Sequence, residues 1–131
     1  MEARQAIEEA VRAADRAITR EDFDALMAFY TDDAVLVVKP GTLARGKAQI
    51  RQAFVHIAEH FAHRLVVKQG AMQVLEAGDT ALVIMETKLE IGEGNAIRHE
   101  TRRATYVFAR RAGAWLCSID NSYGTELLAA G

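Results

Sequence analysis

The residue with the clearest chemical potential is Asp120. It is the only charged residue in the run AWLCSIDNSYG, residues 114–124, which also holds the single tryptophan and the single cysteine. Burying a carboxylate among uncharged residues is costly unless the carboxylate has a polar partner or a function. We therefore expect Asp120 to lie near any chemistry that the protein performs.

A second set of chemically capable residues is HIAEH, residues 56–60. It matches the H-x-x-E-H signature, in which two histidines one helical turn apart hold zinc and a glutamate acts as base. The signature is short, and enzymes that use it need further ligands and a much larger protein. The residues also lie on the helix side opposite Ile50 and Phe54. We expect a solvated helix face here and no metal site.

The length of 131 residues and the hydrophobic content of 50% are those of one domain, 1–131, with one hydrophobic core. A net charge of -2 gives no bulk attraction to nucleic acid or to anionic membranes. The charged N-terminus has neither an apolar signal core nor a run long enough to span a bilayer. The lone Cys117 beside Leu116 is typical of a small buried hydrophobe. We expect a cytoplasmic protein that binds neither nucleic acid nor membrane.

Helical spacing of apolar residues dominates the first half of the chain and alternation dominates the second. The first half is predicted to form helices over 2–18, 22–30 and 47–61, with a short strand over 34–38. The second half is predicted to form strands over 65–76, 80–92, 96–110 and 114–123. Their short connections require antiparallel neighbours. This order predicts an α+β fold in which one face of a curved sheet wraps the helices.

The two faces of the predicted strands differ in character. In strand 80–92, Ala81 and Val83 belong to the set expected to face the helices, and Leu82 and Ile84 lie opposite. Strand 96–110 has no cleanly apolar face. A wet pocket inside and a partner outside would explain polar groups on one face and aromatics on the other. We therefore predict a partner contact formed by Leu82, Ile84, Tyr106 and Phe108.

Four segments carry a family resemblance: AITREDFDALMAFYTDDAVLVV, PGTLARGKAQIRQAF, TRRATYVFARRAGAW and DNSYG. In this order the chain resembles the nuclear transport factor 2-like superfamily, in particular its SnoaL-like and ketosteroid-isomerase-like proteins. The resemblance implies a cone-shaped, cystatin-like fold, with three N-terminal helices packed in the concave face of a curved, mainly antiparallel sheet. It also implies a pocket at the open end and a homodimer through the outer sheet face.

The resemblance does not carry over the catalytic residues of the steroid isomerases, which need an aspartate base, a tyrosine and a protonated aspartic acid. The base position falls at Val38 or Lys39, the tyrosine position near Ala14 and the acid position at Thr105. All three functional side chains are therefore absent, which argues against steroid isomerisation by that constellation.

A different polar patch follows if Thr105 faces the cavity, as the resemblance implies. The residues that would then share the cavity face are Thr101, Arg103 and His99 on one strand and Ser118, Asp120 and Ser122 on the next. Arg103 would hold Asp120 as a charged acceptor, and His99 would carry protons near neutral pH. The alternative is an ion pair between Asp120 and Arg103 that only fixes the register of the strands.

The leading hypothesis is a homodimer whose pocket binds a small, partly apolar organic molecule. If it is an enzyme, we expect a cofactor-independent isomerase, cyclase or hydratase, with Asp120 or His99 as base. Arg103, or Tyr30 near the pocket floor, would polarise an oxygen of the ligand. The alternative is a non-enzymatic ligand-binding or dimerisation module. An assembly module would fill its cavity with side chains.

Overall fold

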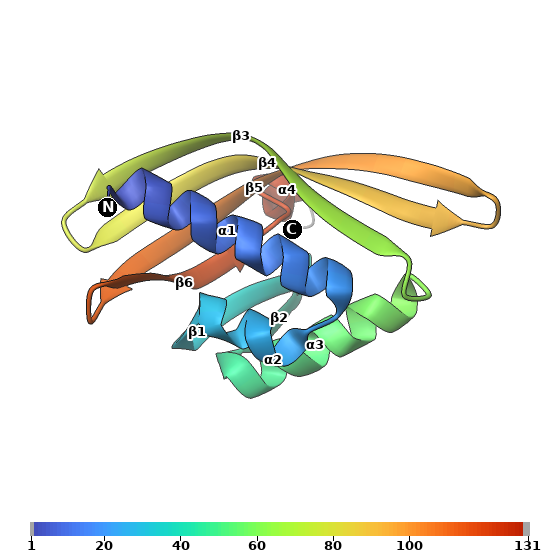
Figure 1. Ribbon diagram of the computed structural model, residues 1–131, viewed down its shortest axis with the longest axis horizontal. Coiled ribbons are helices and arrows are strands. Elements are labelled where there is room, and N and C mark those ends of the chain that lie inside the picture. The colour runs from blue at the N-terminus through green and yellow to red at the C-terminus, as the bar shows by residue number, and fades with distance from the viewer. Residues whose placement is uncertain (1, 130–131) are drawn as a thin grey trace.

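The computed structural model describes residues 2–129, and it has the predicted α+β architecture. Helices cover one face of a curved sheet (Figure 1). The elements are α1 (Ala3–Arg20), α2 (Phe23–Leu26), the 3-10 helix η1 (Met27–Phe29), β1 (Tyr30–Lys39), β2 (Thr42–Arg45), α3 (Gly46–His60), β3 (Leu65–Ala77), β4 (Thr80–Glu93), β5 (Ala96–Arg111), β6 (Ala114–Asn121) and α4 (Glu126–Ala129). No helix among the described residues is both long and apolar enough to cross a membrane.

The helices bury the apolar stripes that their sequences predict. In α1 the fully buried residues include Ile7 and Val11, one turn apart, and this helix packs along β3. The α3 helix buries Ile50 and Phe54 and packs on β1 and β2. Asp22 caps α2 as expected, because its Oδ1 accepts a hydrogen bond of 3.2 Å from the backbone N–H of Ala25.

The described strands form one six-stranded sheet in the order β2-β1-β6-β5-β4-β3. The predicted antiparallel meander from β3 to β6 is confirmed. β1 is longer than predicted and pairs with β6 in parallel, which places Leu36 beside Asp120. The β2 strand was not predicted, because its four residues are too few to show alternation.

The predicted orientation of β5 is wrong by one residue. Phe108 is 0% exposed and Tyr106 is 8% exposed, so both aromatics face the helices and not a partner. Tyr106 is paired with Val83, which is itself buried, and directly paired residues point to the same face. Burying the two aromatic rings stabilises the fold more than burying the threonine and arginine side chains of the other face would. The side chains placed on the opposite face are those of His99, Thr101, Arg103 and Thr105.

A β-bulge sets the orientation of β6. Val107 pairs with Ile119, whereas Phe108 pairs with Cys117, so Ser118 is an extra residue between them. The bulge lets Cys117 and Asp120 both face the interior although three positions separate them. Without the bulge, strict alternation would turn one of the two outward.

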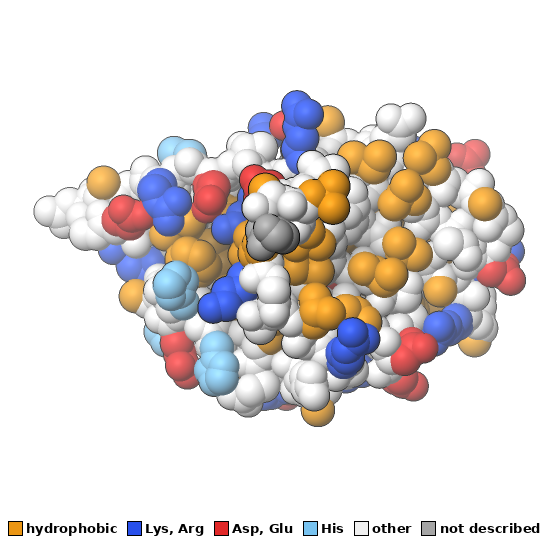
Figure 2. All heavy atoms as spheres, turned by 180° about the vertical axis from the view of Figure 1, so that it is seen from behind, with side chains coloured by type: hydrophobic (Ala, Val, Ile, Leu, Met, Phe, Trp, Pro, Cys, Tyr) orange, Lys and Arg blue, Asp and Glu red, His pale blue; other side chains and the backbone are white. Residues whose placement is uncertain are grey.

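The outer face of the sheet carries an apolar row that crosses four strands. Successive cross-strand pairs join Leu75 to Leu82, Leu82 to Val107, and Val107 to Ile119. Ile84 lies two residues from Leu82 on the same face and is 44% exposed. Figure 2, which shows the molecule from behind, has hydrophobic side chains gathered on this side. We call these five residues the outer row.

The orientation of β5 is tested by truncating two side chains that the prediction and the structure place on opposite faces. Phe108→Ala should lower the free energy of unfolding by about 3–5 kcal/mol, because it empties a fully buried site against Phe29. Arg103→Ala, at an exposed position, should change it by less than about 0.5 kcal/mol. Urea unfolding followed by circular dichroism measures both. Equal small effects would contradict the inward orientation of Phe108.

Candidate functional site

A pocket of about 670 Å³ opens between the helices and the concave face of the sheet. This volume lies in the usual range for small-molecule sites. Its walls are mainly apolar, with side chains from α1, β1, α3, β3 and β4 and from the turn after α3: Ile18, Leu36, Val38, Phe54, Ile57, Phe61, Leu65, Val67 and Leu89. The pocket therefore suits a partly apolar organic molecule.

Asp120 lies at the inner end of this pocket and is only 7% exposed. Its neighbours on the flanking strands are Leu36 and Tyr106. The hydroxyl of Tyr30 donates a hydrogen bond of 2.6 Å to Asp120 Oδ2. Tyr30 is itself buried and does not line the pocket. The structure therefore makes Tyr30 a support for the carboxylate, whereas the sequence suggested a direct ligand contact.

A second carboxylate, Asp15 of α1, lines the same pocket. Burial, and then the negative charge of Asp120, raise the pKa of Asp15 to about 7, against a smaller opposing effect of Arg16. Burial raises the pKa of Asp120 to about 6, although the Tyr30 hydrogen bond opposes this rise. Between these values the pair holds on average about one proton. A base and an acid thus coexist near neutral pH.

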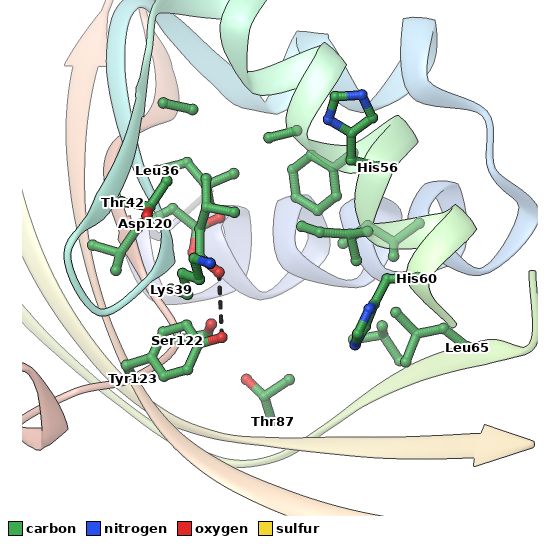
Figure 3. A pocket seen from close by; sticks show the side chains of 18 of the residues that line it. Leu36, Lys39, Thr42, His56, His60, Leu65, Thr87, Asp120, Ser122 and Tyr123 are labelled. Atoms are coloured by element: carbon green, nitrogen blue, oxygen red, sulfur yellow. Dashed lines mark hydrogen bonds between the residues drawn. The ribbon is translucent and has the colours of Figure 1, made fainter. Parts of the chain in front are cut away.

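Two hydroxyl groups face the same region from β4 and β5. Thr87 is buried, and its Oγ1 makes no hydrogen bond of normal geometry among the described residues, although it lies close enough to the Tyr106 hydroxyl to exert a lowering effect on the pKa of that group. Figure 3 shows this side chain directed into the cavity. Burial and the charge of Asp120 hold the pKa of Tyr106 well above its usual value, so its hydroxyl remains a donor. A buried hydroxyl like that of Thr87, without a well-formed hydrogen bond, suits an oxygen atom of a ligand.

The mouth of the pocket is polar and carries positive charge. Lys39 and Arg102 line it, and the Arg102 Cζ lies 4.5 Å from the centre of the Tyr123 ring. The Tyr123 hydroxyl donates to the backbone oxygen of Val38 at 3.2 Å (Figure 3). Ser122, predicted to turn inward, also lines the pocket.

The histidines of HIAEH do not lie on a purely solvated helix face. His56 and His60 both line the pocket from α3, and both are also exposed to solvent, as predicted. His56 Nε2 lies 3.1 Å from Gln52 Nε2. Among residues 2–129 no three His, Cys, Asp or Glu side chains are grouped in a way that could hold a metal ion.

The structure brings together only part of the predicted polar patch. His99, Thr101, Arg103 and Thr105 are not pocket residues, because the register of β5 turns them to the other face. Arg103 is paired with Glu86 across the strands and not with Asp120. Ser118 lies in the bulge, where its hydroxyl donates to the backbone oxygen of Val107 at 3.1 Å. Neither the predicted His99 base nor the Arg103–Asp120 pair is present among the described residues.

Sequence reasoning missed Asp15, Thr87, Arg102 and Tyr106 as pocket residues. Asp15 stands among the charged residues of its helix, yet it follows Val11 by four positions and precedes Ile18 by three. That spacing places it at the edge of the apolar stripe, which is a usable signal. Arg102 and Tyr106 were missed because they share the face of β5 that was expected to be external.

The comparison with protein families agrees with this architecture. Residues 7–118 match the model of the SnoaL-like domain. The chain belongs to the SnoaL-like domain family. The predicted SnoaL-like character of the chain is thereby confirmed. No curated protein matches the sequence.

Solved structures share the fold at low sequence identity. An NTF2-like protein with a cystatin-like fold from Novosphingobium aromaticivorans has a TM-score of 0.81 at 18% identity, covering 89% of this chain and 78% of that one. Aln2 from a Streptomyces species has a TM-score of 0.80 at 16% identity, and the match covers 94% of this chain and 90% of that one. A third structure is that of a protein from Streptomyces avermitilis, described as a candidate dehydratase of the NTF2-like family. Its TM-score is 0.73 at 22% identity, and the match covers 88% of this chain and 91% of that one. These likenesses confirm the cystatin-like fold of the SnoaL-like domain.

The raised pKa of Asp15 predicts a characteristic dependence of stability on pH. The folded state holds a proton on Asp15 up to about pH 7, whereas an unfolded chain loses it near 3.8. Stability should therefore fall as the pH rises from about 4 to about 7. Asp15→Asn should remove this loss and have a higher melting temperature than the wild type at pH 8.

The matched control is Asp33→Asn. Asp33 is exposed, and hydrogen bonds from Thr31 and Arg111 lower its pKa, so this variant should gain no stability at pH 8. Thermal unfolding at pH 4.5 and pH 8 compares the three proteins. An Asp15→Asn variant that is less stable than the wild type at pH 8 would show that the carboxylate is not destabilising.

Proposed function

We propose that this SnoaL-like domain is an acid–base enzyme acting on a small, partly apolar carbonyl compound. The observation that carries the proposal is the pair of carboxyl groups, Asp15 and Asp120, that line one open, mainly apolar pocket and interact electrostatically. Carboxyl groups whose environments separate their pKa values supply a base and an acid at one pH. The raised values place both roles close to neutral pH.

The arrangement favours removal of a proton next to a carbonyl group. Tyr106, the direct neighbour of Asp120 on β5, would donate a hydrogen bond to the carbonyl oxygen and stabilise the charge that develops on it. Asp120, in its ionised form, would take the proton from the neighbouring carbon. Asp15, in its protonated form, would return a proton at another atom, which is an isomerisation. If that atom is a hydroxyl oxygen, its C–O bond breaks, a C=C bond forms and water leaves.

The open cavity supports a small-molecule function over an assembly module. A dimerisation module would fill this space with side chains, yet about 670 Å³ stays free. Binding without turnover is the remaining alternative, and kinetics separates it from catalysis. The candidate dehydratase from Streptomyces avermitilis has the same fold and thus lends the elimination of water some support.

The catalytic proposal is tested with β-hydroxy ketones, whose loss of water produces an absorbing enone. The same compounds report proton removal through deuterium uptake from heavy water, measured by NMR. Asp120→Asn should lower either rate at least about 100-fold, because it removes the base. Asp33→Asn, an exposed aspartate outside the pocket, is the matched control. Binding with neither reaction in the wild type would contradict catalysis.

The pH profile of the active enzyme gives an independent check. The rate should be highest between about pH 6 and about pH 7, since it needs Asp120 ionised and Asp15 protonated. Tyr30→Phe removes the hydrogen bond that lowers the pKa of Asp120. The acidic limb of the pH–rate profile of this variant should therefore move to higher pH, while the alkaline limb stays where it is in the wild type. An acidic limb that does not move would disconnect Tyr30 from the base.

We further propose a homodimer through the outer row. Leu82 and Ile84, two of the four residues predicted to form this contact, lie on the outer face and are 39% and 44% exposed. The other two, Tyr106 and Phe108, are excluded because they are buried in the core. A contiguous exposed apolar surface of this kind is typical of a protein interface.

Ile84→Glu should convert the dimer to a monomer, because a charge in an apolar interface lacks a partner. The control is Ile97→Glu, at another exposed isoleucine that lies ten residues, about 33 Å, along β5 from Val107. Sedimentation velocity measures the mass of each protein. A wild-type chain that remains monomeric at high concentration would refute the dimer.

A further inference from the structure

The pocket of the SnoaL-like domain has opposite charges at its two ends. Asp120 lies in one layer with Leu36 of β1 and Tyr106 of β5. Lys39 stands three residues after Leu36, and Arg102 stands four residues before Tyr106. Because β1 runs parallel and β5 antiparallel to β6, both cations are displaced from Asp120 in the same direction. The displacement along the strands is about 10–13 Å.

Arg102 is held in position at this mouth. Its Cζ lies 4.5 Å from the centre of the Tyr123 ring, and the Tyr123 hydroxyl is fixed to the backbone oxygen of Val38. Nη2 of Arg102 lies 3.6 Å from Glu100 Oε2, which is a loose ion pair. The Arg102 side chain is 21% exposed. A guanidinium has five N–H donors, so this single carboxylate leaves capacity for a second.

Lys39 adds a second positive charge to the lining of the pocket. None of the ion pairs among residues 2–129 involves it. Figure 3 shows Lys39 on the same side of the cavity as Tyr123 and Ser122. The mouth therefore presents one fixed guanidinium and one ammonium group, with apolar walls leading inward from them.

Building on the proposed function, we infer that the substrate is an organic acid. Its carboxylate binds Arg102 and Lys39 at the mouth, its apolar stem follows the walls, and its reacting carbonyl end reaches Asp120. The reverse orientation is disfavoured, because a carboxylate beside Asp15 and Asp120 would meet like charge in a buried site. The charges at the two ends thus select the class of compound and its direction of entry.

Calorimetry with two probes of equal chain length, decanoate and 1-decanol, tests this recognition at pH 7.5. The wild type should bind decanoate about 10-fold more tightly than decanol, and Arg102→Gln should abolish that preference. Arg103→Gln changes the next residue, which faces the other side of β5, and should keep the preference. Glu100→Gln removes the competing carboxylate and should strengthen decanoate binding. Circular dichroism verifies that each variant is folded.

Equal affinity for the two probes, no binding of decanoate, or a preference that survives in Arg102→Gln would overturn the inference. Lys39→Gln provides a second variant, which should weaken the preference without affecting decanol. Asp120→Asn should not weaken decanoate binding, because it removes negative charge from the inner end. Selectivity for decanoate without any turnover would therefore refute only the catalytic proposal. Turnover that depends on Asp120 without selectivity for decanoate would refute only the acid recognition.

Discussion

The site depends on one buried hydrogen bond, from the Tyr30 hydroxyl to the Asp120 carboxylate. A carboxylate with this little exposure needs a donor, and the 2.6 Å contact supplies one from behind the pocket wall. Because Tyr30 occupies the carboxylate on its protein side, the other face of Asp120 remains directed at the cavity. The first residue of β1 and the end of β6 are thereby joined at the pocket's inner end.

The same site works against stability. The pKa values of Asp15 and Asp120 are raised by burial. At neutral and alkaline pH their negative charges therefore destabilise the fold more than neutral amides would at the same positions. Unsatisfied Thr87 Oγ1 adds a further unfavourable group in the same cavity. Such costs, concentrated in one pocket, are what a site selected for chemistry is expected to show.

The general architecture was predictable because it follows from local periodicity. Apolar spacing fixed the stripes of α1 and α3, and the short turns required antiparallel neighbours from β3 to β6. The family resemblance then supplied the cone and the pocket. β2 was missed because four residues give no periodic signal, and the parallel pairing of β1 with β6 joins segments about eighty residues apart.

The sequence alone determined that Asp120 is an isolated carboxylate in an apolar strand, and that a tyrosine, Tyr30, stands at the start of another. Only the tertiary structure decided which side chains surround that carboxylate. Both faces of β5 carry polar and apolar residues, so its sequence does not show which face is inside. A shift of one residue in orientation places Arg102 and Tyr106 in the pocket instead of His99 and Arg103. The bulge at Ser118 and the approach of α1, which brings Asp15, are equally non-local. Strand register and helix docking are set by summed packing over the whole core, which no short stretch of sequence contains.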